Sequence, residues 1–218
     1  TWWFHTSIYY NNKMVLFGGY FVPNAVWELD LTTNVWNKLH DEEDDTSAAP
    51  TRRWFHTSIY YNNKMVVFGG GGTWNNVWEF DLTTNVWKDI SPTTTSVNGL
   101  YDHTSIYYNN KMIVFGGRYL SGSWNNYSND VWELDLTTNV WKNISPSTGT
   151  KPNRRRAHTS IYYNDKMVIF GGYNSYISGY YLNDVWEFDL TTNTWSNITP
   201  TDETAPKPNR RNEHTSIY

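Results

Sequence analysis

The chain has 218 residues, a formal net charge of -4 and no cysteine. That charge is too small and of the wrong sign for binding nucleic acid or an anionic membrane surface, so we expect neither partner. The lack of cysteine excludes disulfides, thiol catalysis and thiolate metal sites. No apolar run approaches the ~20 residues that a membrane-spanning helix needs, so we expect no membrane insertion. Abundant Trp (13) and Tyr (17), beside many Asn, Thr and Gly, indicate a sheet protein with tight turns.

One block of sequence recurs along the chain. His-Thr-Ser-Ile-Tyr begins at residues 5, 56, 103, 158 and 214, at spacings of 51, 47, 55 and 56 residues. Self-similarity at such a period is typical of repeat architectures. The chain therefore divides into four repeats and the start of a fifth. Their approximate bounds are 5–55, 56–102, 103–157, 158–213 and 214–218.

Each repeat begins with a predicted β-hairpin. In the second repeat its strands are residues 57–61 and 64–70, and Asn62-Asn63 links them. Such pairs tolerate the positive φ that a tight hairpin turn requires. The Gly69-Gly70 pair closes the second strand, where we expect either a positive φ or too little space for a side chain.

A second predicted hairpin follows in each repeat. In the second repeat its strands are residues 77–81 (Val-Trp-Glu-Phe-Asp) and 85–90 (Asn-Val-Trp-Lys-Asp-Ile), joined by Asp-Leu-Thr-Thr-Asn. The Asp predicts an Asx hydrogen bond at the start of this turn, and the Asn predicts a left-handed residue at its end. A four-stranded unit of this kind has two apolar faces, and stacking neighbours radially covers both. We therefore expect an all-β fold.

These landmarks resemble the kelch motif. A Gly pair follows a hydrophobic strand, an aromatic-acidic strand comes next, and a Trp follows the Asp turn by about six residues. Kelch repeats run to about 50 residues, in agreement with the spacings. The resemblance covers essentially the whole chain and implies a β-propeller of four-stranded antiparallel blades. Lys-Met-Val-Val-Phe-Gly-Gly is similar to the bacterial or archaeal secreted branch of that family.

The number of blades is open at this point. Residues 214–218 repeat a first strand without the other three, yet residues 5–10 already supply the first strand of the first blade. We expect residues 1–218 to form a single propeller domain of four blades plus one extra first strand, cut from a larger ring. The alternatives are a closed ring of four blades and a homo-oligomer formed by strand exchange between chains.

The connections between strands predict which face binds a partner. Links from strand one to two and from three to four are short and nearly invariant, whereas the other links are long and differ in every repeat. Antiparallel strands place these two kinds of link on opposite faces, and variable loops on a rigid scaffold are typical of recognition. Tyr, Trp and Arg dominate binding hot spots, so we expect a protein segment or a glycan on this loop face. Some of these aromatics alternatively fold back over the blades. The predicted binding residues on the loops are Trp74, Arg118, Tyr119, Trp124, Tyr127, Tyr173, Tyr176, Tyr180 and Tyr181.

Arginines also stand just before the recurring His in three repeats, as Arg53, Arg155 and Arg211. In kelch proteins that resemble this chain, Arg near this position meets an acidic peptide at the pocket mouth, and an Arg fork suits carboxylates. We include these three residues in the predicted binding set. Alternatively each holds a carboxylate between blades. The natural partners for that role are the recurring Glu28, Glu79, Glu133 and Glu187.

The recurring His invites a catalytic or metal-binding interpretation. Its five copies instead indicate a structural role, because a catalytic constellation needs different groups at one point. No phosphate loop, zinc motif or nucleophile elbow occurs, and we expect no cofactor and no metal. The predicted function is a non-catalytic interaction module, and the repeat composition suits an extracellular or cell-surface location, with a cytoplasmic adaptor as the alternative. Two other functions stay open: a carbohydrate-active enzyme similar to sialic-acid epimerases, and a structural component of a surface layer or filament.

Overall fold

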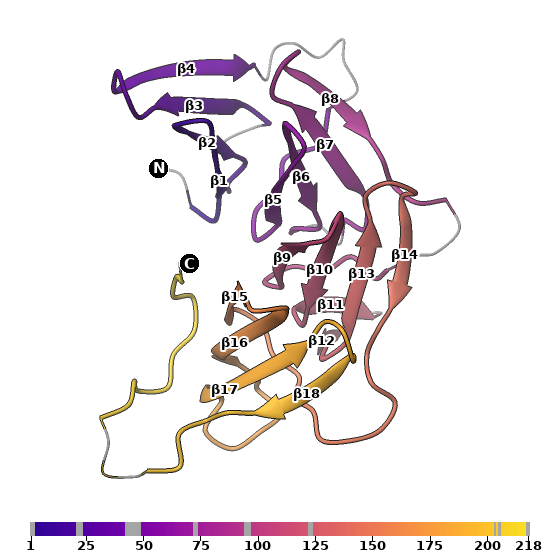
Figure 1. The fold of residues 1–218 in the computed structure, drawn as a ribbon, viewed down its shortest axis with the longest axis vertical. Helices are drawn as coiled ribbons and strands as arrows, with labels where there is room; N and C mark the ends of the chain where they lie inside the picture. The colour runs from indigo at the N-terminus through magenta and orange to yellow at the C-terminus, as the bar shows by residue number, and fades with distance from the viewer. Residues whose placement is uncertain are drawn as a thin grey trace. The chain divides into compact units, whose positions relative to one another are not determined.

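The computed structural model describes residues 3–20, 24–41, 49–71, 74–93, 97–121, 124–202, 204 and 206–216. Every regular element in these ranges is a β-strand (Figure 1). The strands form four four-stranded sheets and one separate two-stranded hairpin. The prediction of an all-β fold built from four-stranded antiparallel sheets is confirmed. No helix in the described part of the chain is long and apolar enough to cross a membrane.

We name the four-stranded sheets blade 1 to blade 4 in chain order. Blade 1 consists of β1 (Thr6–Tyr10), β2 (Lys13–Phe17), β3 (Val26–Asp30) and β4 (Val35–His40). Blade 2 consists of β5 (Thr57–Tyr61), β6 (Lys64–Phe68), β7 (Val77–Asp81) and β8 (Val86–Asp89). Blade 3 consists of β9 (Thr104–Tyr108), β10 (Lys111–Phe115), β13 (Val131–Asp135) and β14 (Val140–Asn143). Blade 4 consists of β15 (Thr159–Tyr163), β16 (Lys166–Tyr173), β17 (Tyr181–Asp189) and β18 (Thr194–Asn197).

The strands of each blade are neighbours in chain order, so each blade is a meander. The extra hairpin, β11 (Arg118–Ser121) with β12 (Trp124–Tyr127), is inserted between the second and third strands of blade 3. In blade 4 the same connection lengthens the two strands instead, because Tyr173 pairs with Tyr181 beyond a bulge. The variable links thus build different structures on a constant sheet.

The two predicted turns are confirmed in atomic detail. In blade 2 the Asn62-Asn63 pair has φ values of 49° and 60°. At the other turn, Asp81 Oδ1 accepts hydrogen bonds from the backbone N–H groups of Thr83 (2.8 Å) and Thr84 (3.0 Å). Asn85 closes this turn with a φ of 59°. Asn and Asp tolerate this left-handed region because their side chains bond the local backbone.

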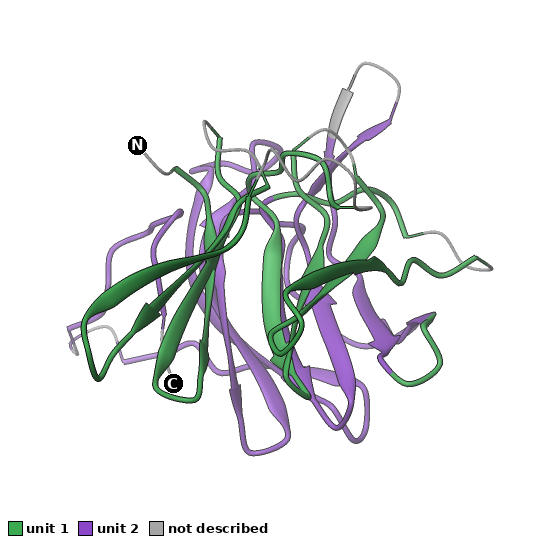
Figure 2. Cartoon of the chain, turned by 90° about the horizontal axis from the view of Figure 1, so that it is seen from above, with its two compact units in different colours: residues 1–101, 137–140 green, residues 102–136, 141–218 purple. Residues whose placement is uncertain are grey.

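The chain divides into two compact units (Figure 2). Unit 1 is residues 1–101 with 137–140 and contains blades 1 and 2. Unit 2 is residues 102–136 with 141–218 and contains most of blade 3 and all of blade 4. The organisation of residues 1–218 as a single propeller domain stays a prediction.

Unit 1 is held together by an apolar layer between its two blades. In each unit, face A is the side of the first blade that packs on the second blade, and face B is the side of the second blade that packs on the first. The equivalent sides of the other blades take the same letters. Trp87 on face B of blade 2 lies between Phe17 of blade 1 and Phe80, with ring centroids 4.7 and 5.0 Å apart. The layer comprises Ile8, Val15, Phe17 and Val26 on face A of blade 1 with Met65, Val67, Trp78, Phe80 and Trp87 on face B of blade 2.

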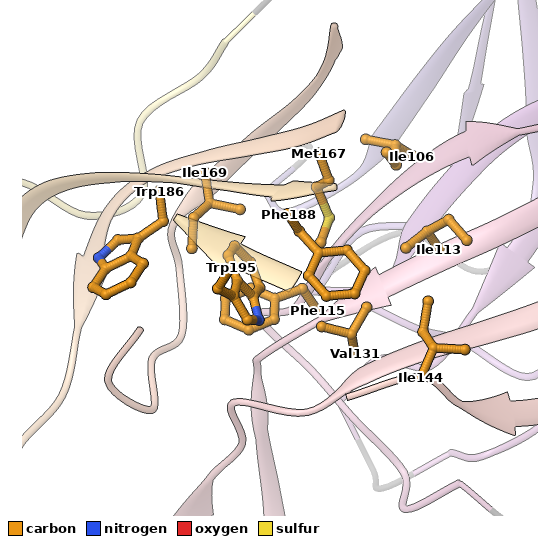
Figure 3. Close-up of a cluster of buried hydrophobic side chains, with 10 residues drawn as sticks. All are labelled: Ile106, Ile113, Phe115, Val131, Ile144, Met167, Ile169, Trp186, Phe188 and Trp195. Atoms are coloured by element: carbon orange, nitrogen blue, oxygen red, sulfur yellow. The ribbon is translucent and has the colours of Figure 1, made fainter. Parts of the chain in front are cut away.

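Unit 2 repeats this layer between blades 3 and 4 (Figure 3). Trp195 lies 4.9 Å from Phe115 and 5.0 Å from Phe188, which are the distances of the unit 1 layer within a few tenths of an ångström. Burying a large aromatic side chain stabilises the fold by roughly 3 kcal/mol. The layer comprises Ile106, Ile113, Phe115, Val131 and Ile144 of blade 3 with Met167, Ile169, Trp186, Phe188 and Trp195 of blade 4.

The recurring His fastens one blade to the next. In unit 1 the Thr6 hydroxyl and His56 Nε2 are 2.8 Å apart, and Gly19 N donates to the Arg53 carbonyl at 2.9 Å. A Cβ on Gly18, whose φ is 73°, would lie only 2.6 Å from the His56 ring, so glycine is needed there. Unit 2 has the same arrangement, with 2.9 Å between Thr104 Oγ1 and His158 Nε2. The His is therefore a structural residue at these positions, as predicted.

Candidate functional site

A cluster of tyrosines gathers on the variable loops of unit 2. The buried Tyr127 ring of β12 packs edge-on against Tyr173 (6.3 Å between centroids) and Tyr176 (5.3 Å). Tyr173 in turn stacks with Tyr180 (6.1 Å) and meets Tyr181 edge-on (5.3 Å). Tyr176, Tyr180 and Tyr181 are exposed, Tyr176 by 64%. We call these five residues the tyrosine cluster; it has two inner rings and three outer rings open to a ligand.

Beneath the cluster lies a buried carboxylate between two arginines. Asp102 Oδ2 is 2.9 Å from Arg156 Nη1 and 3.2 Å from Arg118 Nε. The Arg156 guanidinium lies over the Tyr173 ring, 4.8 Å from its centroid. Burial raises the pKa of Asp102, against the opposing charges of the two arginines. Burial acts to lower the pKa of the Arg156 guanidinium, but the charge and hydrogen bond of Asp102 outweigh this effect and raise that pKa. The Arg156 guanidinium is therefore charged at neutral pH, so the cluster rests on a fixed cation.

The loop that carries the outer tyrosines is tied down by its own polar groups. Arg156 and Tyr173 exchange backbone hydrogen bonds of 3.0 and 2.9 Å. Asn174 is buried, receives the Tyr176 N–H on its Oδ1 (2.8 Å) and donates its backbone N–H to the Tyr180 carbonyl (2.8 Å). The Tyr127 hydroxyl is 3.1 Å from Ser175 Oγ. Since a rigid site loses less entropy on binding, this bracing favours recognition.

Comparison with known proteins identifies the fold family. The attractin/LZTR1 β-propeller family model matches residues 72–218, and the KLHDC2/KLHL20/DRC7 kelch-repeats domain model matches residues 3–99. The chain belongs to the kelch-repeat β-propeller family. The kelch resemblance predicted from the repeats is thereby confirmed, while its bacterial or archaeal secreted branch stays a prediction.

The matched kelch relatives are much longer than the region they share with this chain. Kelch domain-containing protein 3 from Homo sapiens is 35% identical over 85 residues, which are 39% of this chain and 22% of that protein. Kelch domain-containing protein 10 from Rattus norvegicus is 29% identical over 138 residues, which are 60% of this chain and 31% of that protein. The chain thus spans less than a third of the length of these relatives.

A solved structure supports the propeller architecture. The structure of YjhT aligns with a TM-score of 0.71 over 94% of this chain and 67% of the YjhT chain, at 18% identity. At this identity the likeness establishes the fold alone. The fold is that of a kelch-type propeller, which serves generally as a protein-interaction module.

Two of the arginines predicted to bind lie inside the kelch blades. The side chains of Arg53 and Arg155 are fully buried. Arg155 forms a bidentate ion pair with Asp184 (2.8 and 2.7 Å), and Arg53 donates to Asn76 Oδ1 (3.2 Å). Each also donates to the carbonyl of the first Gly in the Gly pair of its blade. The prediction that Arg53 and Arg155 bind a ligand therefore needs correction. A ligand at the surface cannot contact a guanidinium group that has no exposed area.

These two buried arginines have different electrostatic surroundings. Burial lowers the pKa of Arg53 to about 10, since its side-chain partner is a neutral amide. Burial acts to raise the pKa of Asp184, yet the hydrogen bonds and charge of Arg155, with a hydrogen bond from the Trp186 indole, hold it below its usual value. The positive charge of Arg155 is therefore balanced by a bonded carboxylate, whereas that of Arg53 faces a neutral amide.

The recurring Glu residues, which the sequence suggested as partners of these arginines, form other ion pairs in the structure. The recurring Glu pairs with the Lys that opens the second strand of its own blade, not with an arginine of the next repeat. The four pairs are Lys13–Glu28 (2.8 Å), Lys64–Glu79 (2.7 Å), Lys111–Glu133 (2.8 Å) and Lys166–Glu187 (2.5 Å).

The other predicted binding residues are spread over the two units. Arg118 joins the site through Asp102, as described above, and Tyr119 is half-buried in β11 opposite Asn126. Trp74 is exposed in unit 1, outside the tyrosine cluster. Arg211 is exposed after blade 4 and donates from Nε to the Asn209 carbonyl (3.0 Å). Trp124 falls in β12, and its side chain lies outside the described residues.

Sequence reasoning missed Arg156 and Asp102, which lie 54 residues apart and meet under the tyrosine cluster. A signal was present, because the third repeat alone has Asp before its His, and the fourth alone has three successive arginines. This signal does not pair the two residues by itself, because Glu213 is also an acid directly before the fifth His.

Metal ligation has no candidate among the residues that the structure describes. No group of three or more His, Asp or Glu side chains is placed there to hold an ion.

His158 is buried, and its pKa is well below the usual value because of burial, with the charges of Arg155, His103 and His214 acting in the same direction. His158 is therefore uncharged at neutral pH, and its role is the structural contact with Thr104 of the preceding blade.

Proposed function

We propose that this kelch propeller is a non-catalytic interaction module, and that its tyrosine cluster binds a segment of a partner protein. The observation that carries the proposal is the braced group of three exposed tyrosines over the buried Tyr127, the half-buried Tyr173 and a fixed arginine. Tyr supplies a large amphipathic contact at low entropic cost, and Tyr and Arg are enriched in hot spots. A peptide offers both apolar surface for the rings and backbone groups for the hydroxyls.

An enzymatic role has less support at this site. Acid–base chemistry on a sugar needs a carboxyl group free to exchange a proton near the substrate. Asp102 is the buried carboxylate beneath the cluster, and its Oδ2 is engaged by both Arg118 and Arg156. A group held in this way orients arginines better than it transfers protons.

Peptide selection on the 218-residue chain, followed by calorimetry with the selected peptide, tests the proposal. The double variant Tyr176→Ala/Tyr180→Ala is expected to weaken binding on the order of 30-fold or more, since each removes a hot-spot ring. The matched control is Tyr9→Ala, because Tyr9 on β1 is exposed by 64%, the same fraction as Tyr176. The control is expected to bind as the unaltered chain does.

Three results would speak against the proposal. They are unchanged peptide affinity in the double variant, an equal loss in the Tyr9 variant, and the selection of no peptide at all. Binding of an oligosaccharide that depends on Tyr176 and Tyr180, without peptide binding, would assign the same surface to a glycan.

A further inference from the structure

The variable link of blade 1 contributes to a group of aromatic rings at the junction with blade 2. Tyr20, the first residue of that link, meets Trp54 of the next blade edge-on, with ring centroids 5.0 Å apart and planes at 76°. Phe55, which follows Trp54, packs on Phe4 with ring centroids 3.9 Å apart. We call these four residues the aromatic corner. Tyr20 is 44% exposed and Trp54 is half-buried, so both rings present surface to solvent.

The corner occupies the same repeat positions as the ion pairs of unit 2. One position directly precedes the recurring His, one directly follows the Gly pair, and one lies two residues before the next His. In unit 1 and then unit 2 they are Phe4 and Asp102, Tyr20 and Arg118, and Trp54 and Arg156. The backbone matches as well, since Phe55 N donates to the Phe4 carbonyl (3.3 Å) and Ala157 N to the Asp102 carbonyl (2.8 Å). One set of positions thus pairs charges in unit 2 and gathers aromatic carbon surface in unit 1.

Gly71 positions the Trp54 ring. A Cβ at Gly71 would overlap the indole, so glycine is what lets the ring lie against this backbone. Gly71 N also donates to the Trp54 carbonyl (2.7 Å), and Tyr20 meets the ring from the other blade. Because the indole is held in this way before a ligand arrives, it loses little entropy on binding.

The polar groups at this junction limit the ligands that fit. The backbone N–H groups of Tyr20 and Gly71 donate to backbone carbonyls (2.9 and 2.7 Å), so they are not donors for the hydroxyls of a sugar. Desolvating hydroxyls without new partners costs free energy. The buried Arg53 guanidinium, next to Trp54 in the chain, donates to a carbonyl and a neutral amide, and Arg52 beside it is exposed. A positively charged ligand would meet like charge there, so an uncharged apolar group fits best.

We propose that the aromatic corner binds an uncharged apolar side chain, aliphatic or aromatic, of a partner protein. The partner's side chain packs on the solvent-facing surface of Tyr20 and Trp54 and removes that surface from water. Trp and Tyr are among the residue types most enriched in binding hot spots, and exposed aromatic groups mark interaction surfaces. The contact lies in unit 1 and shares no residue with the tyrosine cluster. It therefore goes beyond the proposed function and is tested separately from it.

Capped tripeptides test which side chain the corner takes. The probes are N-acetyl-Gly-X-Gly-amides in which X is Phe, Leu, Lys or Glu, with methyl glucoside as the sugar. Each is titrated into the isotope-labelled 218-residue chain, and NMR follows the indole N–H signal of Trp54, which Trp54→Phe identifies. The Phe and Leu peptides are expected to saturate the shift of this signal at concentrations on the order of 10-fold lower than the other probes require, because only they bury apolar surface on the rings.

Two variants locate the binding at the corner. Tyr20→Ala removes one ring and Gly71→Ala displaces the Trp54 indole, and each is expected to weaken binding of the Phe peptide on the order of 10-fold. The matched control is Tyr107→Ala on β9, because Tyr107 is 40% exposed, close to the 44% of Tyr20. It is expected to leave the titration unchanged. The dispersion of the NMR signals shows whether each variant folds, and Tyr20→Ala decides the question if the Gly71 variant does not.

Several results overturn the proposal. A Trp54 signal that no probe shifts, or that all five probes shift alike, shows that the corner does not select an apolar side chain. Saturation by the Lys peptide, the Glu peptide or the glucoside at the lowest concentration would assign the corner to a cation, an anion or a glycan instead. Unchanged affinity for the Phe peptide in Tyr20→Ala would place its binding elsewhere. None of these results bears on the tyrosine cluster, because its residues take no part in the measurement.

Discussion

The two units carry the same apolar layer but different loops. In each, a Trp of one blade packs between a Phe of its own blade and a Phe of the preceding one: Trp87 on Phe17 in unit 1, and Trp195 on Phe115 in unit 2. Between the Gly pair and the Val-Trp-Glu sequence lie 6 residues in both blades of unit 1, but 13 and 12 in blades 3 and 4. The tyrosine cluster is built on those longer links. The packing that stabilises the units and the proposed recognition site therefore lie on separate parts of the repeat.

The largest expected effect tests whether the two layers are energetically equivalent. Phe17→Ala and Phe115→Ala each remove a fully buried ring, and each is expected to cost about 3–5 kcal/mol. Chemical denaturation followed by Trp fluorescence measures both. Tyr9→Ala, on the exposed side of β1, is expected to change stability by no more than about 0.5 kcal/mol. If one Phe variant is much more destabilising than the other, the two layers are not equivalent.

The second effect separates the two buried arginines. Arg155→Met leaves Asp184 as an uncompensated charge and is expected to cost about 3–5 kcal/mol. Arg53→Met leaves the Asn76 amide and the Gly69 carbonyl without this donor, but no hydrogen-bonded carboxylate, so its expected cost is about 1–3 kcal/mol. The same denaturation experiment compares them. The double variant Arg155→Met/Asp184→Leu is expected to recover most of the loss, and a failure to do so would mean that Asp184 is not the reason for it.

A smaller effect is expected from pH. His158 stays neutral in the folded chain, because burial and nearby positive charge hold its pKa well below the usual 6.5. The unfolded chain takes up this proton near pH 6.5, so below that pH it binds more protons than the folded chain does. Stability therefore falls as the pH drops below about 6.5, and His214 contributes in the same direction.

Thermal melts at successive pH values in that range measure this dependence. His158→Gln removes the titrating ring, keeps a polar side chain near Thr104, and is expected to flatten the dependence. An unchanged slope in the Gln variant would show that other groups are responsible for the pH dependence.

The adjacent Arg155 and Arg156 show how far the sequence predicts the site. Both belong to one run of three arginines, and their backbone atoms are neighbours. Arg155 turns inward to Asp184, whereas Arg156 turns toward Asp102 and the Tyr173 ring. The sequence predicted that arginine matters here, but it placed Arg155 in the binding set and overlooked Arg156. Which residue of such a run faces the loops depends on backbone direction, and repeat alignment does not carry that information.

The repeats by themselves determined the blades, their turns and the Gly pairs, because these depend on residues close together in the chain. Asn62-Asn63 and the Asp81 turn were predicted from local backbone preferences alone, and both hold. The tertiary structure decided which side chains meet. Tyr127 and Tyr176, or Asp102 and Arg156, lie in different repeats and come together only when blades 3 and 4 pack. Packing and electrostatic pairing between repeats act over distances that no local pattern encodes.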